Sequence, residues 1–397
     1  MADAADINAT QLTPSHAPPP VEARQVSADA RAVLEIDLDA LRANWAKLNE
    51  VAGDAECAGV VKADAYGLGL EQIAGALSRE GCRTFFVATI HEARRLRCVD
   101  PSAVIYVLDG LLPGAEAHYA GFDLRPVLSS LPEIEDWSRF CRSEGRMRPA
   151  AVHVDTGMNR LGLQPGDLDA LAGEGSPLDA FTVALVMSHL FNADLPASPD
   201  NRRQLEAFEA ARARLPAAPA SLANSGGTFL GADYHFDLVR PGIALYGGRA
   251  FEGAPNPMRP VVRLRARILQ VRTVPPGGTV GYGATYAANQ PTRVATIACG
   301  YADGFLRALS GSREHPGPLG YISDHPVRII GRVSMDLITV DVSGVPERLV
   351  HRGAWVEMMG DRVTVDDLTD RAGTIGYELL SRLSNRVHRI YIEHPGH

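Results

Sequence analysis

The feature that most constrains the fold is an alternation of short apolar runs with amphipathic stretches over the first two thirds of the chain. We identify eight such runs, each rich in β-branched residues, from ECAGVV (56–61) to HFDLVRPGIALYG (235–247). Most of them are separated by segments with helical periodicity, such as EQIAGALSREG (71–81). Repeated βα units of this number typically close into a parallel barrel. The pattern therefore predicts an α/β protein whose residues 31–260 form a (β/α)8 barrel of the TIM type.

The pattern of predicted secondary structure changes near residue 260. Closely spaced strand-like runs such as VVRLRARILQVRTV (261–274) and LITVDVS (337–343) follow, and helical periodicity is scarce until TIGYELLSRLSN (374–385). We therefore expect a second, mostly β domain over residues 261–397. At the other end, residues 1–30 are rich in Ala, Pro and polar residues and lack the features of a secretory signal, so they are expected to form a disordered tail.

Composition excludes several classes of protein. The apolar runs are too short to span a membrane, and a net charge of −8 without a dense basic block disfavours binding to nucleic acid. The five cysteines are widely spaced and contain no C-x-x-C pair, so neither a disulfide framework nor a metal site is indicated. A soluble, cytoplasmic protein fits these observations best.

Polar residues follow several of the predicted barrel strands. Because active sites of such barrels lie at the carboxyl ends of the strands, these side chains should share one mouth. They are Lys62 after the first run, Arg160 after the fifth, His189 after the sixth, Asn224 and Ser225 after the seventh, and Arg240 with Gly242 in the eighth.

Lys62 ends an otherwise apolar strand, GVVK. Burial there would lower its pKa and supply the neutral amine that forms a Schiff base. Tyr66 and the glycines after it, the NSGG segment at 224–227 and the Gly242–Ile243 pair could each hold a phosphate. Taken singly, the lysine could equally extend to solvent from a strand edge, and each glycine-rich segment could be a tight turn.

Nine motifs in order give the chain a specific resemblance. They are VVKADAYGLG, HVDTGMNRLG, SHL, NSGG, VRPGIALYG, VGYGATY, GYADG, GRVSMD and GYELL. Together they span roughly residues 60–390, and in this order the sequence resembles the bacterial alanine racemases. That family is dependent on pyridoxal 5'-phosphate (PLP), joins a barrel to a β domain, and interconverts L-alanine and D-alanine.

The resemblance implies a role for each motif residue. Lys62 would bind PLP and act as one catalytic base, with Tyr282 as the second base, assisted by His189 and Arg240 through a hydrogen-bond chain. Arg240 would also donate to the pyridine nitrogen, and Arg160 would contact the cofactor and the substrate carboxylate. The remaining cofactor contacts would come from Tyr66, Asn224, Ser225, Gly242, Ile243 and Tyr377. Tyr301 and Met335 would bound the substrate pocket, with Asp336 in support.

The resemblance also implies a homodimer with active sites shared between subunits, because Tyr282 would reach the lysine of the partner. D-Alanine for peptidoglycan would be the product. One departure concerns His153, since many members carry at this position a lysine whose carbamate orients the arginine equivalent to Arg160. Arg160 is therefore expected to be oriented differently here.

Alternative functions differ in identifiable features. A PLP-dependent decarboxylase of basic amino acids would place a glutamate at the pyridine nitrogen, where this chain has Arg240. A PLP-binding protein without enzymatic activity would lack the second domain and Tyr282. A racemase acting on serine, or on a broader set of amino acids, stays open.

Overall fold

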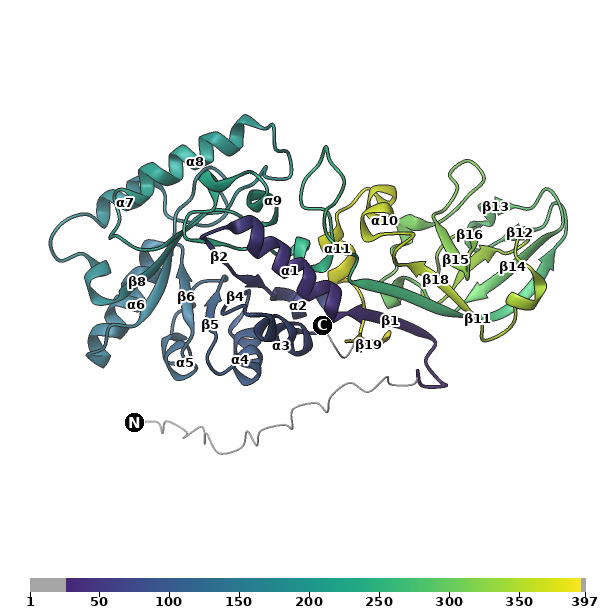
Figure 1. Ribbon diagram of the computed structural model, residues 1–397, viewed down its shortest axis with the longest axis horizontal. Helices are drawn as coiled ribbons and strands as arrows, with labels where there is room; N and C mark the ends of the chain where they lie inside the picture. The colour runs from purple at the N-terminus through teal and green to yellow at the C-terminus, as the bar shows by residue number, and fades with distance from the viewer. Residues whose placement is uncertain (1–25, 394–397) are drawn as a thin grey trace.

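Residues 26–393 of the 397-residue chain are described by a computed structural model. Most of the predicted disordered tail, residues 1–30, therefore lies outside the described residues. Two domains lie side by side, a barrel formed by the first part of the chain and a β domain formed by the last part (Figure 1). The predicted fold class is confirmed.

Each of the eight predicted runs forms at least one strand of the barrel, and all of these strands are parallel. Strands β3 to β9 pair in sequence order, and β10 pairs with β2. The β10 segment lies beside that of β9, because Asp237 N and Arg240 N donate to the carbonyls of Ala220 and Ala223. The first run forms both β2 and β3, with Ala58 between them. The strands are β2 (Glu56–Cys57), β3 (Gly59–Val60), β4 (Thr84–Val87), β5 (Val104–Val107), β6 (Arg125–Leu128), β7 (Pro149–His153), β8 (Thr182–Met187), β9 (Ala220–Ser221) and β10 (Leu238–Val239).

The longer helices cover the outside of the barrel, and several of them begin at side-chain caps. Helix α6 starts after Ser130, whose hydroxyl accepts the N–H of Glu133, and Pro132 occupies its first turn, where no N–H is needed. The helices of this domain are α1 (Leu38–Ala52), α2 (Lys62–Gly67), α3 (Leu70–Glu80), α4 (Ile90–Val99), α5 (Glu116–Gly121), α6 (Leu131–Glu144), α7 (Pro165–Ala170), α8 (Pro199–Arg212) and α9 (Ser225–Thr228). Short 3-10 turns are η1 (Pro177–Ala180), η2 (Ala232–Tyr234) and η3 (Ile243–Tyr246).

The second domain is built on a mostly antiparallel sheet of eight strands in the order β14-β17-β16-β15-β18-β11-β1-β19. Its strands are β1 (Ala32–Asp37), β11 (Val262–Val274), β14 (Thr292–Ile297), β15 (Leu319–Ile322), β16 (His325–Ile329), β17 (Ile338–Asp341), β18 (Trp355–Met359) and β19 (His388–Ile392). A small hairpin adds β12 (Thr279–Val280) and β13 (Tyr286–Ala287), and the helices are α10 (Val365–Ala372) and α11 (Gly376–Ser381). Four 3-10 turns are η4 (Tyr282–Ala284), η5 (Tyr301–Asp303), η6 (Arg307–Leu309) and η7 (Glu347–Leu349).

The first strand corrects one sequence-based assignment. Residues 32–37, which we placed with the barrel, form β1 in the second sheet, antiparallel to β11 and parallel to β19. The chain then enters α1 of the barrel at Leu38 without a linker (Figure 1). A strand's own apolar pattern does not reveal which sheet it will join, because the pairing partners are more than two hundred residues away.

The two domains also meet beside the first barrel loop. The guanidinium of Arg389 in β19 donates to the carbonyl of Gly67 (2.8 Å), and the Tyr391 hydroxyl donates to that of Leu68 (2.9 Å). Within residues 26–393, no helix is long and apolar enough to cross a membrane, and no group of three or more His, Cys, Asp or Glu side chains could hold a metal ion.

Candidate active site

A cavity opens at the carboxyl ends of the barrel strands. Eight of the residues predicted for the site line it together: Lys62, Tyr66, His189, Asn224, Ser225, Arg240, Gly242 and Tyr377. Seven come from barrel loops, and Tyr377 comes from α11 of the second domain. The strand-end residues expected to share one mouth therefore lie together, with the exception of Arg160, which does not line the cavity.

Lys62 opens α2, immediately after the first barrel strand. The four residues after it, Ala63 to Tyr66, have φ between 53° and 56°, so they form a left-handed turn without a single glycine. Burial lowers the pKa of the Lys62 amine, and the positive charge of Arg160 lowers it further, against the opposing effect of Asp109. A larger share of neutral amine is thus available for nucleophilic or basic chemistry.

Ser225, Gly242 and Tyr66 form a polar corner of the cavity. The Ser225 hydroxyl oxygen accepts the N–H groups of Gly242 (2.8 Å) and Ala244 (3.3 Å), which leaves its own proton free to donate to a ligand. Asn224 caps the following turn, because its side chain accepts the N–H of Gly227. The corner therefore presents hydroxyl donors toward the cavity, as an anion requires.

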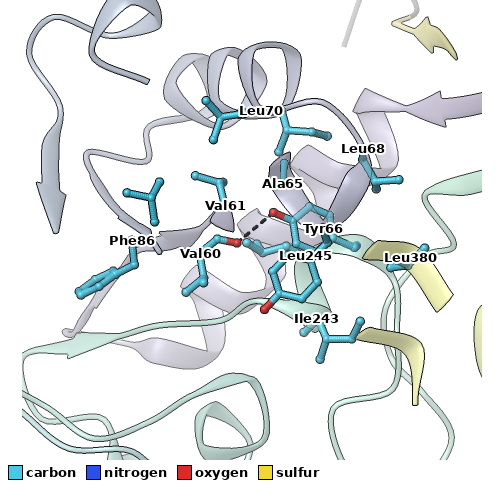
Figure 2. Close-up of a cluster of buried hydrophobic side chains, with 14 of the residues drawn as sticks. Val60, Val61, Ala65, Tyr66, Leu68, Leu70, Phe86, Ile243, Leu245 and Leu380 are labelled. Atoms are coloured by element: carbon cyan, nitrogen blue, oxygen red, sulfur yellow. Dashed lines mark hydrogen bonds between the residues drawn. The ribbon is translucent and has the colours of Figure 1, made fainter. Parts of the chain in front are cut away.

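Tyr66 is buried among apolar side chains beside this corner. Figure 2 shows it near Ile243 and Leu245 from the end of the barrel and Leu380 from α11. Its ring centroid is 4.6 Å from that of Tyr246. Burial raises the pKa of the Tyr66 hydroxyl, so the group stays protonated and serves as a donor.

Arg240 crosses the floor of the cavity and is buried. Its Nη1 donates to the Ser221 hydroxyl, and its Nη2 donates to the carbonyl oxygens of Ser188 (2.5 Å) and Leu222 (3.5 Å). Burial lowers its pKa to about 9, which still leaves the guanidinium charged at neutral pH. None of its hydrogen bonds within residues 26–393 uses Nε, so that N–H is available to a ligand.

Two histidines lie near this guanidinium. Burial, with Arg240 adding to it, holds the pKa of His189 well below its usual value and lowers that of His153 to about 4. Both imidazoles are therefore neutral, and Nδ1 of His153 lies 3.2 Å from the Ser129 hydroxyl. Within residues 26–393, the Nη donors of Arg240 are directed to serine and backbone oxygens. The hydrogen-bond chain through His189 and Arg240 stays a prediction.

The other predicted residues lie outside the cavity wall. Ile243 is buried directly behind Gly242, and Arg160 is on the exposed loop after β7. Tyr282, Tyr301 and Met335 are 72%, 42% and 54% exposed on the second domain, and none of them lines the Lys62 cavity. Asp336 is paired with Arg386 (2.6 Å).

Sequence reasoning missed part of the site. The wall also includes Phe86, Leu108 and Met187, which belong to three of the apolar runs and carry no polar group to mark them as site residues. Ser188 and Ser221, the Arg240 partners, lie at strand ends like the predicted residues, and that position was the available signal.

The barrel, its half-buried Lys62 amine and the hydroxyl donors of Ser225 and Tyr66 define a barrel enzyme with an amine and an anion-binding corner in one cavity. Comparison with known families is more specific. Residues 36–250 match the family model for the alanine racemase N-terminal domain, and residues 261–391 match that for the alanine racemase C-terminal domain. The chain belongs to the alanine racemase family.

Similar proteins cover almost the whole chain. An alanine racemase of Methylobacterium sp. (strain 4-46) is 51% identical over 360 residues, which are 91% of this chain and 97% of that protein. The catabolic alanine racemase of Agrobacterium fabrum is 47% identical, with 95% of this chain and 96% of that protein covered. The biosynthetic alanine racemase of the same organism is 46% identical, with 90% of this chain and 93% of that protein covered. The crystal structure of Bartonella henselae alanine racemase with covalently bound pyridoxal phosphate is 40% identical, with a TM-score of 0.86, 91% of this chain covered and 100% of that one.

Proposed function

We propose that this protein interconverts L-alanine and D-alanine with PLP bound to Lys62. The observation that carries the proposal is the convergence of the Lys62 amine, the Ser225 and Tyr66 hydroxyls and the Arg240 guanidinium on one cavity. Membership of the alanine racemase family, and the pyridoxal phosphate bound to the Bartonella relative, support it.

The donor set fits this cofactor. A phosphate dianion needs several N–H or O–H donors, and the corner formed by Ser225 and Tyr66 offers hydroxyls whose protons are not used elsewhere in residues 26–393. The Nε–H of Arg240 suits an unprotonated ring nitrogen, because a guanidinium donates a hydrogen bond and keeps its proton. Bound PLP would supply the electron withdrawal that makes the substrate α-proton acidic.

The residues of the chain would then handle the proton. Lys62, with its lowered pKa, would remove or deliver the α-proton on one face of the substrate. Racemisation needs a second group on the opposite face, and we assign this role to Tyr282. Arg160 would hold the substrate carboxylate, with Tyr301 and Met335 bounding the pocket.

Because Tyr282 does not reach the cavity of its own chain, we propose that a second copy supplies it. Tyr282, Tyr301, Met335 and Leu337 are large exposed side chains. They belong to neighbouring loops, since Tyr301 N donates to Ser334 O (3.0 Å) and a Cβ at Gly281 would lie 3.1 Å from Arg332 N. An exposed apolar patch of this kind is typical of an interface.

Mixing two inactive variants tests the shared site. In a hybrid of Lys62→Ala and Tyr282→Phe subunits, one of the two sites has both bases intact, so an equal mixture should recover about a quarter of the parent activity. Each variant alone should lose at least about 100-fold. An inactive mixture, after hybrid dimers are demonstrated, would contradict the exchange of Tyr282 between subunits.

The substrate preference of the enzyme and its role in the cell need separate measurements. Incubation of the purified protein with L-alanine and with L-serine, followed by quantification of the D-enantiomers, tests the preference for alanine over the serine or broader alternative. We propose that the enzyme supplies D-alanine for peptidoglycan in the cytoplasm, where its five free cysteines would stay reduced. Growth of a deletion strain without added D-alanine, in the absence of a second racemase, would contradict that role.

A further inference from the structure

The turn that carries Lys62 and Tyr66 is strained. A left-handed conformation costs roughly 1–2 kcal/mol for each residue other than glycine, and Ala63, Asp64, Ala65 and Tyr66 adopt it in succession. Nothing in the local sequence favours it, apart from some tolerance at Asp64. Such a turn persists only where surrounding contacts hold it.

One of these contacts is the buried side chain of Glu92. It is the third residue of α4, where it completes a capping box with Thr89. Its Oε2 accepts the N–H groups of Ala88 (2.9 Å) and Thr89 (3.2 Å), and its Oε1 accepts the N–H of Asp64 (3.2 Å). The same carboxylate therefore caps α4 and fixes the backbone of the left-handed turn.

A second contact comes from Arg95, one turn further along α4. Its Nη2 donates to Asp64 Oδ1 (2.6 Å), and its Nε and Nη2 donate to the two carboxylate oxygens of Glu71 in α3 (2.7 Å each). Asp64 Oδ1 also accepts the N–H of Leu70 (3.2 Å). Asp64 is thus held at its backbone by Glu92 and at its side chain by Arg95.

We infer that Glu92 and Arg95 are positioning residues for the reaction. They hold the turn in its left-handed conformation, and in that conformation both Lys62 and Tyr66 point to the cavity. Neither side chain lines the cavity, so each holds the turn through Asp64. The charge of Glu92 also acts directly on the Lys62 amine, whose pKa it raises. The inference deepens the proposed function and rests on it where the cofactor is concerned.

The barrel contains a matched control for Glu92. Glu133 is the third residue of α6, where it accepts the N–H groups of Leu111 (3.1 Å) and Ser129 (2.5 Å), and its own N–H donates to Ser130 Oγ. It therefore performs the same capping in another βα unit without touching the Lys62 turn. Glu133→Gln should cost similar stability to Glu92→Gln.

The test compares the parent, Glu92→Gln, Arg95→Met and Glu133→Gln as purified full-length proteins. Amide hydrogen exchange in the cofactor-free protein reports the turn, and titration with PLP, followed by absorbance, reports the cavity. Glu92→Gln should speed exchange at residues 63–69 and weaken PLP binding by about tenfold, since the lost bond involves a charged acceptor. Arg95→Met should change the exchange rate and the PLP affinity in the same direction as Glu92→Gln does. Glu133→Gln should change neither the exchange rate at residues 63–69 nor the PLP affinity by more than about twofold.

Two outcomes would overturn the inference. One is unchanged exchange at residues 63–69 in both Glu92→Gln and Arg95→Met. The other is an equal loss of PLP affinity in Glu133→Gln. If Glu92→Gln does not fold, Arg95→Met decides alone. Failure of the parent to bind PLP would refute the proposed function, whereas the exchange comparison would still decide whether α4 holds the turn.

Discussion

The Tyr66 hydroxyl occupies the space that a Cβ at residue 242 would fill. The contact is possible only because Gly242 has no side chain, and it joins the first and last barrel loops at the candidate phosphate corner. A sequence motif thus has a steric explanation: the glycine of RPGIALYG is required by the tyrosine of KADAYG.

Gly242→Ala should therefore displace Tyr66. We expect a loss of about 1–3 kcal/mol in the free energy of unfolding, together with weaker PLP binding. Urea unfolding and absorbance titration measure the two effects. Gly121→Ala is the control, because a Cβ there meets nothing within 4 Å. Equal behaviour of the two variants would contradict the steric argument.

Arg240→Lys should destabilise the protein although it keeps the charge. A lysine amine cannot reach the Ser221 hydroxyl and the carbonyls of Ser188 and Leu222 from one position, so buried acceptors lose their donors at a cost of about 1–3 kcal/mol. Thermal denaturation of the cofactor-free protein measures the loss. The exposed change Arg139→Lys should stay within about 0.5 kcal/mol of the parent.

Stability should decrease in mild acid because of His153. The folded protein keeps this imidazole neutral down to its lowered pKa of about 4, whereas the unfolded chain takes up a proton near the ordinary value of 6.5. The stabilisation is complete above the unfolded pKa and is lost as pH falls through this window, by about 1.4 kcal/mol for each pH unit. Urea unfolding of the parent and of His153→Gln across that range gives the test: identical pH slopes would contradict it.

Asn44→Leu should weaken the junction between α1 and the last barrel loop. The buried Asn44 amide donates to the carbonyls of Leu245 (3.1 Å) and Arg259 (2.9 Å), and its oxygen accepts the N–H of Arg259 (2.8 Å). Leaving these backbone groups unpaired should cost about 1–3 kcal/mol for the most buried of them. Asn49→Leu, on the exposed side of the same helix, should have little effect on the urea midpoint.

Local patterns determined much of this protein. Short apolar runs rich in β-branched residues, alternating with helical stretches, located the eight barrel strands. The strand-end rule then selected Lys62, Ser225 and Arg240, because the carboxyl ends of parallel strands must meet. These inferences depend on neighbours in sequence, and the structure brings the selected side chains to one cavity.

Contacts between distant segments decided the rest. They place β1 in the second sheet, direct Arg240 to Ser221 and Ser188, hold the Lys62 turn left-handed against its local preference, and leave Tyr282 outside its own chain's cavity. Hydrophobic periodicity predicts none of these features, because all of them depend on contacts with residues far away in the sequence. The sequence alone identified the side chains of the candidate site. Tertiary packing determined how those side chains are positioned and which other groups they contact.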